Sequence, residues 1–216
     1  MKCVVTAGPT YEPLDEVRRL TNFSTGRLGS ELANFLVEQG HQVTLLIGYY
    51  ATHRGTLKAQ RVDTFTTTAD LLARLRALGD SSIDAVFHAA AVSDFSFGGV
   101  WERNSDGQLV RCKERKISTR KGQLLAELEP TPKLIRELRN WFPRARLVGW
   151  KYELDGDRAQ VLDVALKQIA QNHTDACVVN GAAYGDGFGL ATADGGCRHL
   201  ADATALYSAL GNFIDR

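Results

Sequence analysis

The sequence has little of what marks membrane-spanning, secreted or metal-binding proteins. Its 216 residues include only four cysteines, which are scattered and form no C-x-x-C pair, so neither a zinc site nor a disulfide framework is implied. No apolar run approaches the roughly 20 residues that a membrane span requires, and residues 1–7 are too quickly broken for a signal peptide. A formal net charge of +1 gives no field that favours nucleic acid or a membrane. We therefore expect a cytoplasmic protein without a metal-ligand cluster of its own.

Two common nucleotide-binding signatures are also missing. The glycines near the N-terminus are not spaced as G-x-G-x-x-G, and they do not form a P-loop with its terminal lysine. None of the six tyrosines has a lysine four residues later, which argues against an NAD(P)-dependent short-chain reductase. Any ligand site must therefore be recognised from other residues.

Apolar runs alternate with helical patterns along the chain. The strand-like runs cover residues 3–6, 42–47, 61–65, 85–89, 146–149 and 176–179, and amphipathic stretches with a period near 3.6 residues accompany them. This alternation predicts a mostly parallel sheet covered on both faces, which is a doubly wound, Rossmann-like α/β fold. Ligands of such folds gather at the carboxyl ends of the strands. The chain has no evident linker or repeat, so we expect one domain over residues 1–216.

Residues 95–129 interrupt the alternation. Residues 104–107 form a turn between two β-like stretches, which predicts a hairpin, and residues 124–128 form a further candidate strand. We interpret this region as a β arm or flap. Its basic run is either a solvated face or part of a flap that closes over phosphates; the run comprises Arg111, Lys113, Arg115, Lys116, Arg120 and Lys121, with Glu114 as its one acid. A second hairpin is predicted around residues 194–196.

Several residues predict helix ends. Thr131, followed by Pro132, has the pattern of an N-cap with proline at the first helical position of a helix over residues 134–142. Thr68 can cap a helix over residues 71–78, and Asp202 can cap a closing helix over residues 206–214. Gly40 can close the first helix.

The opening stretch, residues 2–30, combines a strand, a glycine turn, a polar loop and a helix start near residues 24–26. Unpaired N–H groups and the helix dipole make such a start a natural anion site. Residues suited to a phosphorylated ligand are Gly8, Gly26 and Gly29 for close backbone approach, Arg18 and Arg19 for charge, and Asn22, Ser24 and Thr25 for hydrogen bonds. Taken alone, the pattern also fits a purely structural turn.

Six stretches resemble, in order, the phosphopantothenate–cysteine ligases (phosphopantothenoylcysteine synthetases). The first is T-A-G-P-T-x-E-P-L-D-x-V-R-x-L-T-N-x-S-T-G-x-L-G over residues 6–29. The others are A-A-A-V-S-D-F at 89–95, R-K-I at 115–117, L-E-P-T-P-K-L-I at 128–135, V-G-W-K-Y-E at 148–153 and D-A-C-V-V-N at 175–180. The resemblance implies the ligase half of this family without its flavin decarboxylase half, so no flavin is expected.

The resemblance and the strand-end rule together define an expected site. Asn22 and Lys116 match family residues that contact the reacting groups. The expected nucleotide-binding residues are Gly8, Pro9, Thr10, Gly48, His88, Ala89, Ala90, Asp94, Pro132, Lys133, Leu134, Ile135 and Trp150. The expected substrate-binding residues are Arg18, Ser24, Thr25, Gly26 and Asn180. From the residues alone, Asp94 can hold a ribose hydroxyl, a metal ion or a basic side chain, or it can simply cap a turn. Trp150 is as readily a core residue as a ligand contact.

The family reaction implies the ligands. A nucleotidyl group passes from CTP or ATP, with Mg²⁺, to the carboxylate of 4′-phosphopantothenate, and pyrophosphate is released. The amine of L-cysteine then displaces the nucleoside monophosphate, which completes a step of coenzyme A biosynthesis. Family members are usually dimers, so the resemblance also implies a homodimer held through residues 95–129.

The sequence departs from the family pattern at three charged positions. Gln168 and Asn172 stand where two family lysines bind nucleotide phosphates, and Ser118 replaces another lysine. Lys167 lies one residue from Gln168. These departures leave open an altered relative that binds nucleotide or phosphopantothenate without full turnover, and the sequence does not distinguish CTP from ATP.

Overall fold

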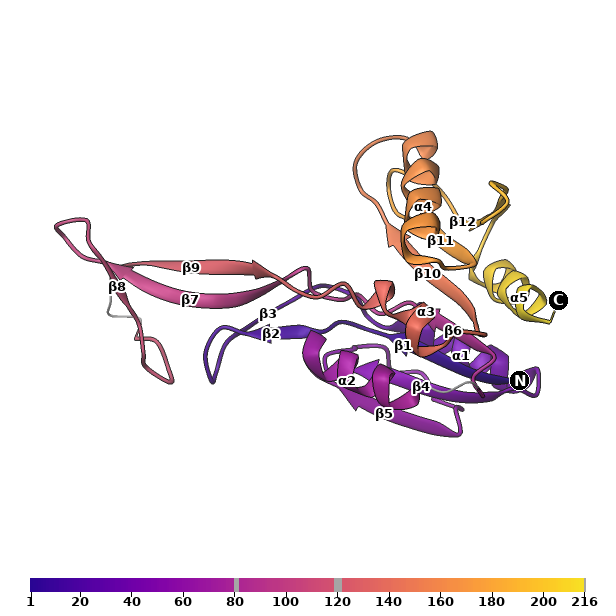
Figure 1. Cartoon of the computed structure of the whole chain (residues 1–216), viewed down its shortest axis with the longest axis horizontal. Helices are drawn as coiled ribbons and strands as arrows, with labels where there is room; N and C mark the ends of the chain where they lie inside the picture. Colours follow the sequence, from indigo (N-terminus) through magenta and orange to yellow (C-terminus); the bar gives the residue numbers. More distant parts are fainter. Residues whose placement is uncertain (80–81, 119–121, 216) are drawn as a thin grey trace.

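An eight-stranded sheet forms the centre of the protein (Figure 1). The computed structural model describes residues 1–79, 82–118 and 122–215. The strand order is β13-β12-β11-β10-β6-β1-β4-β5. In chain order these strands are β1 (Lys2–Ala7), β4 (Gln42–Gly48), β5 (Arg61–Phe65), β6 (Ala85–His88), β10 (Arg146–Tyr152), β11 (Ala176–Asn180), β12 (Phe188–Thr192) and β13 (Cys197–Leu200).

The sheet confirms the predicted doubly wound, Rossmann-like α/β fold. From β1 the chain moves outward to β4 and β5, returns to β6 on the other side of β1, and moves outward again to β10 and β11. All these strands pair in parallel, whereas β12 and β13 are antiparallel at one edge, as the predicted second hairpin requires. The winding reverses between β1 and β6, and folds of this kind bind ligands at such a reversal.

Helices cover both faces of the sheet. On one face, α1 (Arg27–Glu38) and α5 (Ala203–Ile214) pack against Val5, Leu45 and Val178. On the other face, α2 (Thr68–Leu78), the 3-10 helix η1 (Leu134–Arg136) and α3 (Leu138–Trp141) pack against Val4 and Leu46, while α4 (Arg158–Asn172) packs against the outer strands. Successive side chains of a strand point to opposite faces of the sheet, so the continuous apolar runs supply residues to both cores.

Two predicted helix ends are confirmed and two are wrong. The side chain of Asp202 caps α5, and Gly40, with φ +85°, follows the end of α1. Thr67, not Thr68, caps α2: the Thr67 side chain accepts the N–H of Asp70, while Thr68 is the first helical residue and its hydroxyl donates to Thr10. The helix predicted over residues 134–142 is divided into η1 and α3. Thr131 does not cap it: Lys133 occupies the N-cap position of η1, and the Thr131 hydroxyl donates to the carbonyl oxygen of Ser93.

A three-stranded β arm projects from the body of the molecule (Figure 1). It consists of β7 (Phe95–Arg103), β8 (Leu109–Arg111) and β9 (Gln123–Pro130), in the order β8-β7-β9. The hairpin predicted around residues 104–107 and the strand predicted over 124–128 are therefore present. Arg120 and Lys121 of the predicted basic run lie outside the described residues.

The loop after β8 is bound to a second hairpin, which the sequence did not predict. This hairpin is formed by β2 (Tyr11–Pro13) and β3 (Arg19–Thr21), within the segment expected to be loop. Asp15 in its turn accepts the backbone N–H of Ile117 at 3.1 Å, and Arg18 donates to the carbonyl oxygen of Ile117. Ile117 is only 3% exposed, although it lies on the arm. The arm loop is thus anchored on its own chain.

No helix among the described residues has the length and apolar character needed to cross a membrane.

Glycines let the loops after β1 and β4 approach each other closely. A Cβ atom at Gly48 would overlap the carbonyl oxygen of Pro9, and one at Gly8 would lie 2.8 Å from the Cβ of Ala51. Gly8 also has φ +79°, a conformation that glycine adopts without strain. These contacts account for glycine at both positions, and no ligand is needed to explain them.

We predict that Gly48→Ala lowers the free energy of unfolding by about 1–3 kcal/mol, because the new methyl group meets backbone that cannot rotate away. Urea unfolding followed by circular dichroism measures this. Gly122→Ala is the matched control: its Cβ would lie 3.5 Å from the nearest atom, and a change within about 0.5 kcal/mol is expected there. Equal effects of the two substitutions would contradict the packing role of Gly48.

Candidate functional site

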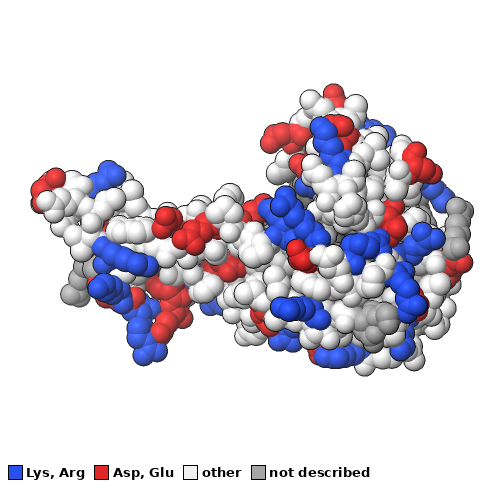
Figure 2. Space-filling view, viewed as in Figure 1, with Lys and Arg blue, Asp and Glu red and all other residues white. Residues whose placement is uncertain are grey.

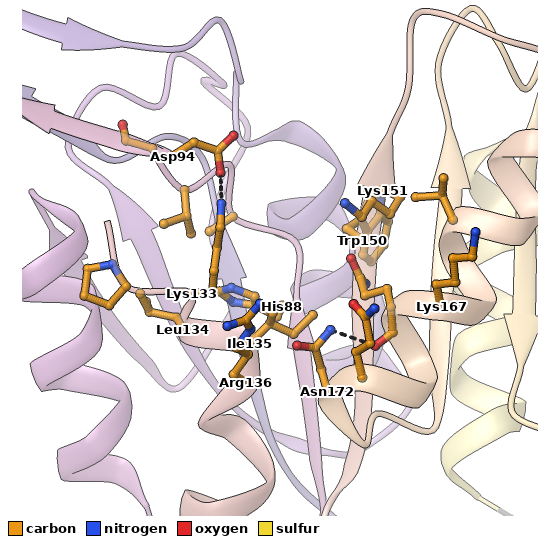
Figure 3. A pocket seen from close by; sticks show the side chains of 17 residues that line it. His88, Asp94, Lys133, Leu134, Ile135, Arg136, Trp150, Lys151, Lys167 and Asn172 are labelled. Carbon is orange, nitrogen blue, oxygen red and sulfur yellow. Dashed lines mark hydrogen bonds and ion pairs between the residues drawn. The ribbon is translucent and has the colours of Figure 1, made fainter. Parts of the chain in front are cut away.

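A pocket of about 450 Å³ lies beside the carboxyl ends of β6 and β10 (Figure 3). Four segments form it: the turn after β6, residues 132–136 before and within η1, the end of β10, and one side of α4. Eight of the expected nucleotide-binding residues line it, namely His88, Ala90, Asp94, Pro132, Lys133, Leu134, Ile135 and Trp150. Segments that lie far apart in the sequence therefore meet around one cavity.

A second group of expected residues lies behind the pocket wall. Pro9 forms a parallel bridge with Ala91, and Thr10 donates its N–H to the carbonyl oxygen of Ala91 at 3.1 Å. Asn22 donates to the same oxygen at 2.9 Å, and the Thr10 hydroxyl accepts the N–H of Ser93 at 2.8 Å. Residues 8–10 and 22 thus position the turn after β6. They do not line the pocket, and neither do Gly48 and Ala89.

The start of α1 lies next to this group. Gly26 occupies the N-cap position with φ +78°, and no side chain caps the helix. Ser24 donates its N–H to the Asn22 side chain at 3.4 Å, and the carbonyl oxygen of Thr25 accepts the N–H groups of Thr52 and His53. Ser24, Thr25 and Gly26 are therefore close to Asn22 but outside the pocket lining.

Three expected residues are remote from the pocket lining. Lys116 precedes the anchored Ile117 on the arm, and Arg18 pairs with Asp15 at 3.2 Å in the hairpin that holds that loop. Asn180 ends β11, where its side-chain oxygen is buried and has no hydrogen-bond partner among the described residues. Within one chain, the structure does not bring Lys116 or Arg18 to the pocket.

His88 is a neutral hydrogen-bond donor at the pocket wall. The buried Thr6 hydroxyl accepts the N–H of Ala90 and lies 3.0 Å from Nδ1 of His88. A hydroxyl can accept two hydrogen bonds, but its own proton also needs an acceptor, and Nδ1 of His88 is the only one that it contacts among the described residues. We therefore assign the hydroxyl proton to the bond with Nδ1, which leaves the ring proton on Nε2. Burial lowers the pKa of the imidazole to about 4, so the ring stays uncharged near neutral pH. Figure 3 shows His88 between the two ends of the cavity.

The basic groups of the pocket are concentrated at its rim. Lys133 pairs with Asp94, Lys151 lies 3.9 Å from Glu153, and Lys167 pairs with Asp163 at 2.6 Å. Arg136 is exposed and has no acidic partner among the described residues. In the view of Figure 2, lysine and arginine side chains gather on the body of the molecule. The rim can therefore attract an anionic ligand, and Asp94 holds a basic side chain, one of the roles considered for it.

Residues of α4 complete the wall, and none of them was among the expected site residues. They are Val164, Lys167, Gln168, Gln171 and Asn172, which recur at spacings of three and four and so share one side of the helix. Gln168 and Asn172 were noted only as replacements of family lysines; both are buried, at 8% and 7% exposure. Helical periodicity groups these residues, but only the packing of α4 places them opposite η1.

Cys177 and Trp150 both adjoin the sheet core, but only Trp150 reaches the pocket. Cys177 lies in a strand-like run, is fully buried, and has its thiol pKa raised to about 12 by burial, so it is a protonated core residue. Trp150 lines the pocket and also packs against the core beneath α1 and α5. Both readings of Trp150 are therefore compatible with its position.

Comparisons with known proteins agree on one family. The family described as DNA/pantothenate metabolism flavoprotein C-terminal domain matches residues 1–197. The coenzyme A biosynthesis bifunctional protein CoaBC of Thermococcus kodakarensis is 32% identical over 181 residues, which are 83% of this chain and 41% of that protein. The chain thus spans less than half the length of the curated relatives that it matches first.

Solved structures share the fold over the whole chain. The DNA/pantothenate metabolism flavoprotein from Streptococcus pneumoniae has a TM-score of 0.85 and 25% identity, and the match covers 100% of this chain and 98% of that one. A mutant of Cab2 in complex with phosphopantothenate-cysteine has a TM-score of 0.73 and 18% identity, with coverage of 99% and 87%. At the latter identity the likeness concerns the fold alone.

We predict that His88 makes the protein less stable in acid. An unfolded histidine binds a proton near pH 6.5, whereas folded His88 does so only near 4, so stability is lost as the pH falls through this window. The loss specific to His88 is roughly 3 kcal/mol at full extent. Urea unfolding at several pH values compares the free energy of unfolding of the wild type with that of His88→Gln, which should lack the fall due to His88. The control His53→Gln should show the same fall as the wild type. A His88→Gln variant with the wild-type pH profile would contradict the buried, neutral state of His88.

Proposed function

We propose a function on the premise that this chain belongs to the DNA/pantothenate metabolism flavoprotein C-terminal domain family. The chain acts as a phosphopantothenate–cysteine ligase, which joins 4′-phosphopantothenate to L-cysteine and consumes a nucleoside triphosphate in coenzyme A biosynthesis. The observation that carries the proposal is the convergence of eight expected nucleotide-binding residues on one pocket beside the strand ends of a doubly wound sheet. The first two relatives, which are named for coenzyme A biosynthesis, also support it.

The chemistry suits such a pocket. A carboxylate has a poor leaving group, so it must be activated before an amine can displace an oxygen from its carbon. Transfer of a nucleotidyl group forms an acyl-nucleotidylate and releases pyrophosphate, and attack by the cysteine amine then releases the nucleoside monophosphate. The first step brings several negative charges together, which Lys133 and Lys151 at the rim can offset.

Mg²⁺ fits as a partner of the nucleotide. The described residues hold no cluster of three or more histidine, cysteine or acidic side chains that could bind a metal. Mg²⁺ commonly uses one or two carboxylates together with substrate phosphates and water, and Asp94 at the pocket rim offers such a carboxylate. When bound, the ion would neutralise phosphate charge. The proposal includes no flavin.

Asn22 and Lys116 are the proposed catalytic residues. Asn22 is held by Ala91 beside the pocket wall, and its neutral amide can donate to an acyl carbonyl without adding charge. Ser24, Thr25 and Gly26, which adjoin it, form the proposed pantothenate side. Lys116 is anchored on the arm of its own chain, so we assign its action to the pocket of a second copy.

Exposed apolar residues on the arm support the proposed homodimer through residues 95–129. Phe95, Leu109, Val110 and Leu128 are 45–52% exposed. A narrow β ribbon cannot bury both of its faces alone, and contact with a second copy would cover them. In this arrangement the chain forms one domain, residues 1–216, and its arm contacts the pocket of the second copy.

The alternative is a relative that binds nucleotide or phosphopantothenate without full turnover. It is favoured by the neutral side chains of Gln168 and Asn172 at the positions of two family lysines. The two functions differ in whether pyrophosphate is released.

We predict that the protein with Mg²⁺ and CTP or ATP releases pyrophosphate only when 4′-phosphopantothenate is present, and that cysteine is then incorporated into the product. Asn22→Ala should lower the rate by about 10²-fold, the usual effect of removing one aligned donor. A coupled pyrophosphate assay and mass spectrometry of the product measure this. Folded protein that releases no pyrophosphate with either nucleotide would exclude the ligase and favour the binding relative.

We further predict that two inactive variants complement each other. If Lys116 acts in the partner's pocket, mixing Asn22→Ala with Lys116→Ala subunits yields hybrid dimers with one intact site, and activity recovers to about a quarter of the wild type by statistical exchange. Light scattering measures whether the protein is a dimer. The control is the Asn22→Ala variant alone, taken through the same exchange procedure. A dimer in which the mixed variants stay inactive would place Lys116 in its own subunit's site.

A further inference from the structure

The pocket wall formed by α4 presents two amide oxygens. Asn172 donates its Nδ2 to the backbone oxygen of Gln168 at 2.7 Å, and Gln168 donates its Nε2 to Sγ of Cys177 at 3.2 Å. The thiol of Cys177 is directed to the carbonyl oxygen of Val178 at 3.6 Å, so its sulfur accepts from Gln168. Both amide nitrogens are therefore occupied by the protein. Neither side-chain oxygen accepts a hydrogen bond within residues 1–79, 82–118 and 122–215.

The orientation of Gln168 is built into the fold. A Cβ atom at position 149 would overlap Nε2 of Gln168 and would lie 2.9 Å from Cδ1 of Ile135. Glycine at this position leaves the space in which the amide nitrogen reaches Cys177. The amide oxygen is then the free polar atom of a side chain that lines the pocket.

This part of the wall is unfavourable for phosphate. Two acceptor oxygens repel the oxygens of a phosphate group, since both sides lack a proton to share. The helix α4 ends at Asn172, so the negative end of its dipole lies at the same place. In Figure 3, Asn172 lies at the end of the pocket opposite Asp94 and Lys151. The basic side chains of Lys133, Arg136 and Lys151 suit phosphates, whereas the two amide oxygens on α4 suit a group that carries N–H donors.

His88 adds a donor to these acceptors. His88 lines the same pocket, and with the Thr6 hydroxyl assigned as the donor to Nδ1, the ring proton is on Nε2. Cytosine and adenine each present an amino group, which donates, next to a ring nitrogen, which accepts. Uracil and hypoxanthine present the reverse, a carbonyl oxygen next to a ring N–H. A wall that combines acceptors with a donor therefore matches the first pair and mismatches the second.

We propose that Gln168, Asn172 and His88 form a base-reading subsite that selects an amino-bearing nucleobase, cytosine or adenine, over its keto counterpart. The inference rests on the proposed nucleotide-dependent function and assigns this end of the pocket to the base. The two amides that replace family lysines are then specificity-determining residues, and the phosphates lie at the Lys133 and Lys151 end.

The test is calorimetric binding of Mg²⁺ complexes of four nucleotides, used as two matched pairs: CTP with UTP, and ATP with ITP. In each pair the amino member should bind about tenfold more tightly than the keto member, the effect of one satisfied against one mismatched hydrogen bond. Gln168→Met and Asn172→Leu keep the side-chain volume but remove the acceptor, so each should reduce this ratio several-fold. Asn212→Leu, on the opposite face in α5, is the matched control and should keep the wild-type ratio.

Two further outcomes overturn the inference in different ways. If all four nucleotides bind equally, or if Asn172→Lys tightens the binding of inorganic triphosphate and of every nucleotide alike, the wall is a phosphate subsite, while nucleotide use itself stands. If no nucleotide binds to the folded wild type, the base-reading subsite fails together with the proposed ligase function. Circular dichroism of each variant establishes that it is folded.

Discussion

The parallel pairing of β1 with β6 determines where the pocket lies. The register from Cys3 with Ala85 to Thr6 with His88 makes both strands end at the same level. The bridge between Pro9 and Ala91 continues the pairing beyond the strands, and Asn22 and Thr10 bind the same turn. The residues behind the wall and the residues in the wall therefore form one hydrogen-bonded unit. A change in either strand would move the whole unit, since buried backbone groups keep their partners.

The polar groups of the pocket fall into two kinds. The buried ones, His88, Gln168 and Asn172, are neutral and are held by specific hydrogen bonds, because a buried charge without a partner would be costly. The charged ones, such as Lys133 and Lys167, lie at the solvent-exposed rim and pair with acidic neighbours. A ligand with a neutral ring and a charged tail fits this division. The loop of the arm is anchored apart from the pocket, by Asp15 and Arg18 of the neighbouring hairpin.

Much of the fold and part of the site could be predicted because they depend on local properties. Apolar runs of β-branched residues indicated the six parallel strands, and turn residues indicated the hairpins around residues 104–107 and 194–196. The helix over residues 134–142 could not be predicted correctly, because the Thr131 hydroxyl binds Ser93, a residue 38 positions earlier. The hairpin of β2 and β3 was also missed, since each strand has only three residues and little apolar pattern.

The sequence by itself determined the layered α/β architecture and which segments reach the strand ends, because the periodicity of strands and helices depends only on residues that are close together in the chain. Only the tertiary structure decided which of those residues share a cavity. It placed α4 opposite η1, so that Gln168 and Asn172 face residues from the turn after β6. It also oriented their amides, through Cys177 and the space left at Gly149, and kept Lys116 on the arm. These outcomes depend on packing between distant segments, which no local pattern contains.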